Sequence, residues 1–170
     1  DEQTVPRPET PYAVMKRLAE QIVLQTSSVV LRCGTVVGGE LAVRNPSVLH
    51  RLVASFRSQP TLRLEDDNLA FVHRDDLAAL VHTISREKLG LNLETGATWP
   101  VYNVASWTGS LQALADMAGQ RDLVMLTPVR RPFMDVSLVR TTFPSWAPRS
   151  MQTIVDTMRA GVVDAKQAAS

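Results

Sequence analysis

PYAVMKRLAEQIVLQTSSVVLRCG, residues 11–34, contains the clearest structural signal in the chain. Apolar residues recur at intervals of three and four from Ala13 to Val23, which predicts a helix over residues 11–24 with one apolar stripe. The SVVLR run at 28–32 follows directly, and a short, continuous, β-branched run is typical of a strand buried on both faces. A helix that leads into a buried strand favours an α/β fold.

The rest of the chain continues this alternation. After residue 34 we expect a helix over 46–56, then strands over 61–64 and 70–73 with an acidic turn between them at 65–68. A helix capped by Asp75 or Asp76 should follow and end near 88, and then a strand over 101–106 and a helix from 109 or 110 to 118. The last expected elements are a strand over 123–126, a proline-punctuated loop over 128–148 and a helix over 149–160. Strands alternating with helices predict a largely parallel sheet.

The composition narrows the class of partner. The chain has 170 residues, of which 45% are hydrophobic, and this is enough for one compact domain with a sizeable core. Its 18 basic and 17 acidic residues leave a net charge of +1, so no strong field favours nucleic acid or a membrane surface. We therefore expect no nucleic-acid partner, and instead a small molecule or another protein.

Other features predict a soluble, cytoplasmic protein. The apolar runs are far shorter than the roughly 20 residues that a membrane-spanning helix needs, so we expect no membrane segment. Cys33 is the one cysteine, which excludes an internal disulfide and fits a reducing cytoplasm. The chain begins at Asp1 rather than methionine, and its first residues read as an acidic, proline-containing surface loop. We therefore expect it to be part of something longer.

Tyr12 and Lys16 form a Y-x-x-x-K pair, and further landmarks surround the pair in a definite order. An acidic, proline-rich run precedes the tyrosine, and Ala-Glu at 19–20 follows the lysine. The later landmarks are VVLRCGTVVG at 29–38, FVHRDDLAAL at 71–80, VYNVAS at 101–106 and a proline at 148 that leads into the closing helix. Together these segments resemble the extended short-chain dehydrogenases/reductases, the NAD-dependent epimerase/dehydratase family, over essentially the whole chain.

The resemblance is to the carboxy-terminal half of that family. It implies a Rossmann-like, mostly parallel, doubly wound sheet plus a small substrate-binding subdomain. Residues 1–32 would form the tyrosine-lysine helix and the following core strand, and residues 33–170 the remaining core elements interleaved with the subdomain. The glycine-rich turn that receives the dinucleotide pyrophosphate is absent from the sequence. The family's catalytic serine or threonine would also lie upstream of Asp1, so an amino-terminal dinucleotide-binding half must be supplied.

For the Tyr12–Lys16 pair, the resemblance implies proton transfer. Tyr12 would be the general acid/base, while Lys16 would stabilise its phenolate and hydrogen-bond the nicotinamide ribose. A tyrosine has an ordinary pKa of about 10, and a fall of roughly three units needs on the order of 4 kcal/mol of preferential stabilisation of the phenolate. A lysine four residues later lies on the same helix face and supplies positive charge. The alternative is a half-buried aromatic residue beside a solvated lysine, a spacing that is common by chance.

The resemblance also implies which residues contact the cofactor, NAD or NADP. Cys33, Gly34 and Thr35 would line its nicotinamide end, together with Tyr12 and Lys16. Cys33 stands where the family usually has proline, and we expect it to be a small buried residue rather than a reactive thiol. The choice between NAD and NADP stays open, because the residue that reads the adenosine ribose belongs to the other half.

The substrate is predicted only by class. Asn45, Arg51 and Arg131 are candidate substrate-binding residues, although surface solvation is the usual role of an arginine. Leu69 stands where sugar-nucleotide enzymes of the family commonly have an arginine that binds a substrate phosphate. A sugar nucleotide and a less charged carbonyl or alcohol compound therefore both remain open.

A metal site is not expected. His73, Asp75 and Asp76 lie close together, but they have no further ligand at a recognisable spacing. Helix capping explains these residues better.

Three functions follow from these observations. The first is an NAD(P)-dependent oxidoreductase or epimerase/dehydratase, active only with a companion polypeptide or the missing half. The second is a non-catalytic subunit that retains half of the fold as an interaction surface, and in either case a homodimer through the tyrosine-lysine helix is expected from the family. The third is a self-contained α/β binding domain with chance motif matches, which predicts no nucleotide affinity.

Overall fold

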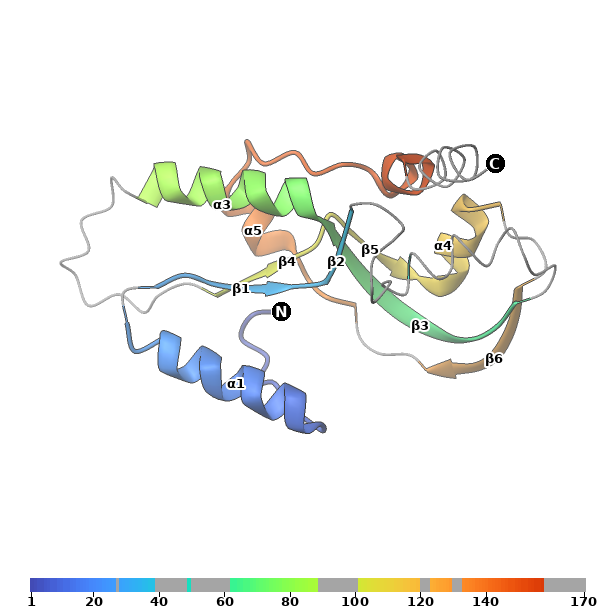
Figure 1. Cartoon of the computed structure of the whole chain (residues 1–170), viewed down its shortest axis with the longest axis horizontal. Helices are drawn as coiled ribbons and strands as arrows, with labels where there is room; N and C mark the ends of the chain where they lie inside the picture. Colours follow the sequence, from blue (N-terminus) through green and yellow to red (C-terminus); the bar gives the residue numbers. More distant parts are fainter. Residues whose placement is uncertain are drawn as a thin grey trace, which may run out of the picture.

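The computed structural model of the chain describes residues 1–26, 28–38, 49, 62–88, 101–119, 123–129 and 133–157 (Figure 1). The helices are α1 (Pro11–Val23), α3 (Arg74–Lys88), α4 (Leu111–Met117), α5 (Ser137–Thr142) and a closing helix described over 151–157. The strands are β1 (Val30–Cys33), β2 (Thr35–Val37), β3 (Leu62–His73), β4 (Val101–Val104), β5 (Trp107–Ser110) and β6 (Leu123–Val129).

Parallel pairing dominates the sheet, as the alternation of elements predicts. β1 pairs with β4, β2 with β3 and β6 with β3, all in parallel, whereas β5 runs antiparallel to β3. The α/β fold with a mostly parallel sheet is therefore confirmed.

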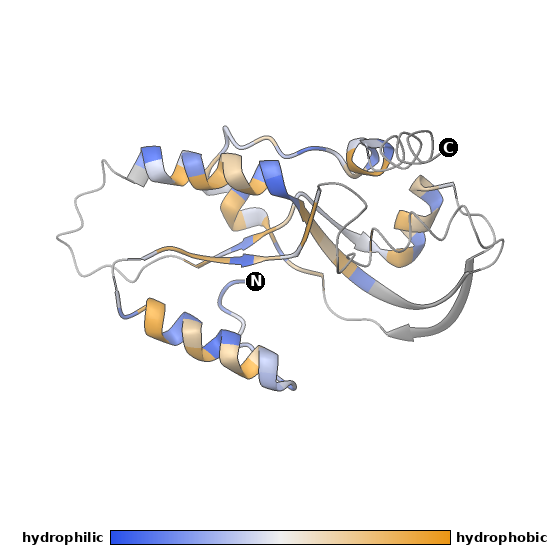
Figure 2. Cartoon of the chain, in the orientation of Figure 1, coloured by the Kyte–Doolittle hydropathy of each residue, from blue (hydrophilic) through white to orange (hydrophobic). Residues whose placement is uncertain are grey.

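Helix α1 begins and ends close to the predicted positions. The Thr10 side chain accepts a hydrogen bond from the Ala13 backbone N–H, and Pro11 occupies the first turn, where its missing N–H has no cost. The helix ends at Leu24, whose N–H donates to the Glu20 carbonyl. None of the residues of α1 is buried, and the helix lies against one side of β1 with apolar residues still exposed (Figures 1 and 2).

Strand β3 separates two hydrophobic clusters. Successive residues of a strand point to opposite faces of the sheet. Phe71 packs in one cluster with residues of α4 and of the closing helix, and it stacks on Trp107 at 6.1 Å between ring centroids. Val72 packs in the other cluster with residues of α3 and α5, where Tyr102 meets Phe143 edge-on. Helices therefore cover both faces of this part of the sheet.

The outer edge of β4 is closed by a side chain. The Asn103 backbone N–H points away from β1 and donates to Glu2 Oε1 at 3.0 Å. The Asn103 side-chain amide donates to the Asp135 carbonyl, and Arg32 Nη1 donates to the Glu2 carbonyl at 3.1 Å. The amino-terminal segment is thereby fixed against the β1–β4 pair.

Three predictions of secondary structure were wrong. The two strands and acidic turn expected over 61–73 form one strand, β3. Pairing with β6, β2 and β5 holds the backbone extended, and the pairing with β6 continues past a register shift near Leu64. The loop expected over 128–148 contains α5, which buries Val139. No strand was expected over 107–110, but these residues form β5, after which Ser110 caps α4, as one of the two predicted helix starts.

Other predictions hold or lie outside the described residues. The helices over 74–88 and 111–117 and the strand from 123 are confirmed. Of the helix predicted over 46–56, Leu49 alone is described, and it is helical and buried. Among the helices of the described ranges, none combines the length and apolarity needed to traverse a lipid bilayer.

Candidate functional site

Tyr12 and Lys16 lie one turn apart on the first half of α1. Lys16 Nζ stands 5.6 Å from the centroid of the Tyr12 ring, within the range of a cation–π contact. The Tyr12 side chain is 66% exposed, so its contribution to the core is small. This pair therefore has no evident role in packing.

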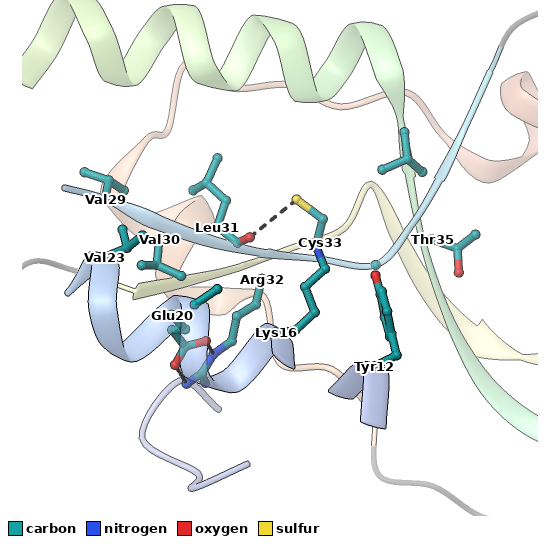
Figure 3. Close-up of a pocket in the computed structure, with 13 residues that line it drawn as sticks. Tyr12, Lys16, Glu20, Val23, Val29, Val30, Leu31, Arg32, Cys33 and Thr35 are labelled. Carbon is teal, nitrogen blue, oxygen red and sulfur yellow. Dashed lines mark hydrogen bonds and ion pairs between the residues drawn. The ribbon is translucent and has the colours of Figure 1, made fainter. Parts of the chain in front are cut away.

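A cavity of about 840 Å³ separates α1 from β1 (Figure 3). Its lining residues at the carboxyl end of β1 include Tyr12, Lys16, Cys33, Gly34 and Thr35. Figure 3 shows Tyr12 and Thr35 at this end, and Val23 and Val29 at the opposite end. The structure thus brings together the five residues predicted to contact a cofactor.

Three predicted substrate-binding residues remain untested. Asn45, Arg51 and Arg131 lie outside the described residues.

Gly34 lies where two strands approach closely. A Cβ atom at this position would lie 2.6 Å from the Ala70 carbonyl oxygen of β3. Because the obstructing atom belongs to the backbone, it could not move aside as a flexible side chain would. Packing alone therefore explains why residue 34 is a glycine, independently of its predicted contact with the cofactor.

The Cys33 side chain lies at an exposed position at the end of β1. Sγ makes a weak contact with the Leu31 carbonyl at 3.7 Å. The residue is exposed, yet neighbouring protein atoms displace enough water to raise the pKa of the Cys33 thiol above its ordinary value. The prediction that Cys33 is a small buried residue is therefore wrong, because β1 leaves this side chain exposed. That the thiol is not reactive stays a prediction.

An ion pair that the sequence did not reveal fastens α1 to β1. Arg32 donates from Nε to Glu20 Oε2 at 3.0 Å and from Nη2 to Glu20 Oε1 at 2.8 Å, and Arg17 donates to the same carboxylate at 2.7 Å. The hydrogen bond from Arg32 is the main cause of the lowered pKa of Glu20. The signal for this ion pair in the sequence was the presence of opposite charges, Glu20 and Arg32, within the 11–34 stretch.

A second polar cluster was also missed. The buried Asp76 carboxylate accepts from Ser106 Oγ at 2.9 Å, from the Arg149 backbone N–H at 3.0 Å and from Arg149 Nη1 at 2.8 Å. The Trp146 indole donates to the Asp76 carbonyl at 2.8 Å. Asp76 was predicted to cap α3, but it lies inside the first turn and joins three segments of the chain instead.

His73 takes the capping role that Asp75 or Asp76 was expected to have. Its Nδ1 accepts from the Asp75 backbone N–H at 3.2 Å and lies 2.7 Å from Arg149 Nη1. Both of these partners are donors, so Nδ1 serves as their acceptor. Nε2 faces Gly38 (φ +109°), where a Cβ atom would lie 2.6 Å from it. No metal-binding group of three or more residues occurs in the described ranges.

Solved structures with similar folds include a sugar-nucleotide epimerase and a sugar-nucleotide dehydratase. The UDP-glucuronic acid 4-epimerase from Bacillus cereus, solved with UDP-glucuronic acid and NAD, has a TM-score of 0.68 and 19% identity over 96% of this chain. The dTDP-glucose 4,6-dehydratase from Bacillus anthracis, solved with NAD, gives 0.64 and 18% over 92%. RMD from Pseudomonas aeruginosa, solved with NADPH, gives 0.65 and 19% over 95%.

The likeness is one of fold, and it covers part of those enzymes. No family model and no curated protein sequence matches the chain. The chain spans 56%, 54% and 58% of the three enzymes, respectively. It therefore has the Rossmann-type fold of NAD-dependent epimerases and dehydratases over little more than half of their length, in a match consistent with their carboxy-terminal half.

Proposed function

We propose that the chain supplies the proton-transfer half of an NAD(P)-dependent oxidoreductase or epimerase/dehydratase. The observation behind this proposal is the cavity whose lining combines Tyr12, Lys16 and residues 33–35. These residues lie at the carboxyl end of β1, and ligands of open α/β sheets bind at the carboxyl ends of strands. The similar enzymes, solved with NAD or NADPH, support the same class of reaction.

The chain fits one end of a dinucleotide. Lys16 offers an ammonium group and Tyr12 a phenol hydroxyl at the polar end of the cavity, both suited to ribose hydroxyls. The glycine-rich turn that would hold the pyrophosphate does not occur in this sequence. When bound, the dinucleotide would accept or donate a hydride. Cys33, Gly34 and Thr35 would contact its nicotinamide end.

Tyr12 and Lys16 would divide the proton chemistry between them. The Tyr12 hydroxyl would take or give the proton at the substrate oxygen, because a general acid/base must reach that atom directly. Lys16 would favour the phenolate through its positive charge, 5.6 Å from the ring centroid, and would hold the ribose. Residues 1–32 would then form the catalytic part of the core, and residues 33–170 the rest of the core with the substrate-binding subdomain.

The substrate proposed is a sugar nucleotide or another carbonyl or alcohol compound. The Bacillus cereus enzyme binds UDP-glucuronic acid, and a further similar structure, MoeE5, binds UDP-glucose. Asn45, Arg51 and Arg131 would contact the substrate. Leu69 offers no charge for a phosphate, so those arginines would have to supply it.

A fusion protein tests the proposal. The part of the Bacillus cereus epimerase outside its match is joined through a flexible linker to residue 1 of this chain, and conversion of UDP-glucuronic acid with NAD is followed by chromatography. We expect Tyr12→Phe to lower kcat by a factor of about 100 or more, the usual contribution of general acid/base catalysis. Gln21→Ala, on the same helix, is the matched control. The proposal would be overturned if the Tyr12→Phe fusion turned over substrate as fast as the unmodified fusion. It would also be overturned if the unmodified fusion bound NAD but turned over no substrate.

A second function is favoured by the exposed side of α1. Met15, Leu18 and Ile22 form a stripe at helical spacing and are 65%, 53% and 65% exposed. Such a stripe suits a helix–helix interface, so α1 would join two copies of the chain into a homodimer. If the Tyr12–Lys16 pair proves inert, the chain would act as a non-catalytic interaction subunit. A cytoplasmic location stays a prediction.

A further inference from the structure

A second cavity, of about 360 Å³, lies between α1 and the segment that precedes it. Arg7 and its two flanking prolines line it from the segment, and Tyr12, Lys16 and Arg17 line it from α1. Arg7 and Arg17 do not line the larger cavity between α1 and β1, although both cavities share Tyr12 and Lys16. A volume of this size suits a small ligand or one charged group of a larger ligand.

Positive charge exceeds negative charge in the lining of this second cavity. Four cationic side chains line it against one carboxylate, that of Glu20, whereas the whole chain has a net charge of only +1. Glu20 accepts one hydrogen bond from Arg17 and two from Arg32 (Figure 3). Among the described residues, Arg7 and Lys16 form no ion pair. The cavity therefore presents positive charge that no carboxylate of the described ranges balances.

The segment that carries Arg7 is held on both sides of this residue. Glu2 hydrogen-bonds to the β1–β4 pair, and the Thr10 side chain caps α1. Between these anchors, Pro6 has a fixed φ, and the residue before Pro8 is restricted to an extended backbone. A backbone restricted in this way loses less conformational entropy when its side chain binds a ligand. Arg7 is therefore positioned beside α1 before a ligand arrives.

We propose that the second cavity binds a diphosphate group through Arg7, Lys16 and Arg17. Guanidinium groups bind phosphate oxygens through two parallel hydrogen bonds, and an ammonium group adds further donors. Arg17 donates to Glu20 from Nη1, which leaves Nε and Nη2 for a ligand. One phosphate carries at most about two negative charges, so two linked phosphates match the excess of positive charge better than one.

The proposed site is independent of proton transfer at Tyr12. Binding needs the positive charge of Arg7 and of α1, and it needs no turnover. The Tyr12 ring and the two prolines give the cavity an apolar wall. The organic part of a nucleoside diphosphate can pack against such a wall, so the group that binds is either free or carried by a nucleoside.

An NMR titration of the separate chain with pyrophosphate tests the proposal. The backbone amide of Ala13 and the Nε–H groups of Arg7 and Arg17 should shift together, with a dissociation constant on the order of 1 mM. The amides of Gly34 and Thr35, which line the larger cavity and not this one, should stay in place. The affinity should fall as the salt concentration rises from about 20 to about 200 mM, because salt screens exposed charges.

Two variants provide a matched comparison in this titration. Arg7→Gln should raise the dissociation constant for pyrophosphate at least about fivefold, since one charge-assisted contact is lost. Arg7 is exposed and forms no hydrogen bond or ion pair with described residues, so the amide spectrum of residues 62–88 should not change. Arg74→Gln removes the same charge from an exposed position of α3 outside the cavity lining, and it should leave the dissociation constant unchanged.

UDP distinguishes a free diphosphate from one that a nucleoside carries. Binding of both UDP and pyrophosphate that depends on Arg7 would support the site, and tighter binding of UDP would show that the nucleoside contacts the apolar wall. Binding of pyrophosphate without binding of UDP would show an adventitious ion only and overturn the proposal. Equal affinity of Arg7→Gln and the unmodified chain, or shifts confined to Gly34 and Thr35, would also overturn it. None of these results involves turnover, so a failure here is distinct from a failure of the proposed function.

Discussion

Asp76 joins the start of α3 to the turn at Ser106 and to the segment before the closing helix. We expect Asp76→Ala to lower the free energy of unfolding by about 2–4 kcal/mol, because the buried Ser106 hydroxyl, the Arg149 backbone N–H and the partly exposed Arg149 guanidinium lose their common acceptor together. Urea unfolding at neutral pH measures the loss.

Asp75 is the matched control for that prediction. Its carboxylate is 54% exposed and contacts Arg149 Nη2 at 3.4 Å. Exposed ion pairs contribute little, so Asp75→Ala should change the free energy of unfolding by less than about 1 kcal/mol. Similar losses in both variants would mean that Asp76 does not hold the three segments together.

At the scale of secondary-structure elements, the attachment of α1 depends on Glu20 and Arg32. The pKa of Glu20 is lowered from its ordinary value of 4.5, first by the hydrogen bond from Arg32. A carboxyl whose pKa is lower in the folded state adds stability above its unfolded pKa, and this stability is lost as the pH falls through the folded pKa. The contact between α1 and β1 should therefore weaken below pH 4.5.

Arg32→Met should remove this pH dependence. At neutral pH we expect lower amide protection factors in α1, since the two-pronged contact to Glu20 is lost, and little further change in these factors on acidification. The unmodified chain should reach the same protection factors only in acid. Arg86→Met, at an exposed arginine of α3, should leave both profiles unchanged. If the pH dependence of amide exchange in α1 is unaltered in Arg32→Met, other carboxylates cause it.

Elements with a strong local signal were predictable from the sequence. The 3.6-residue periodicity identified α1 and α3, Ser110 was one of the two predicted starts of α4, and the apolar runs identified β1 and β4. The error at β3 came from the acidic residues 65–67, which favour a turn locally, whereas pairing with β6 holds them in a strand. Helix α5 is six residues long and was missed among prolines, because burial of Val139 rather than a periodic pattern stabilises it.

The candidate site likewise contains residues that could be predicted from the sequence and contacts that could not. Tyr12, Lys16 and residues 33–35 could be named because their two segments resemble those of a known enzyme family. The Glu20–Arg32 contact spans 12 positions, and the Asp76–Arg149 contact spans 73. Such pairs depend on how distant segments pack, and no local pattern encodes that.

At the scale of the whole molecule, the stripe of Met15, Leu18 and Ile22 should cause self-association. Leu18→Glu places two like charges in a symmetric interface, and we expect the dissociation constant to rise at least tenfold, equivalent to about 1.4 kcal/mol. Gln21→Glu, on the same helix, should have little effect. Light scattering across a concentration series measures the change, and equal behaviour of the two variants would place the interface elsewhere.

The contact of Glu2 with the outer edge of β4 has a consequence for assembly. An open sheet edge on each side would let copies add without limit, as in fibrous aggregates. Here a carboxylate occupies the backbone donor of Asn103 on the outer side of β4, so an added strand would meet a competing partner on that side of the β1–β4 pair. Fibres built by strand addition at this edge of the pair are thereby disfavoured.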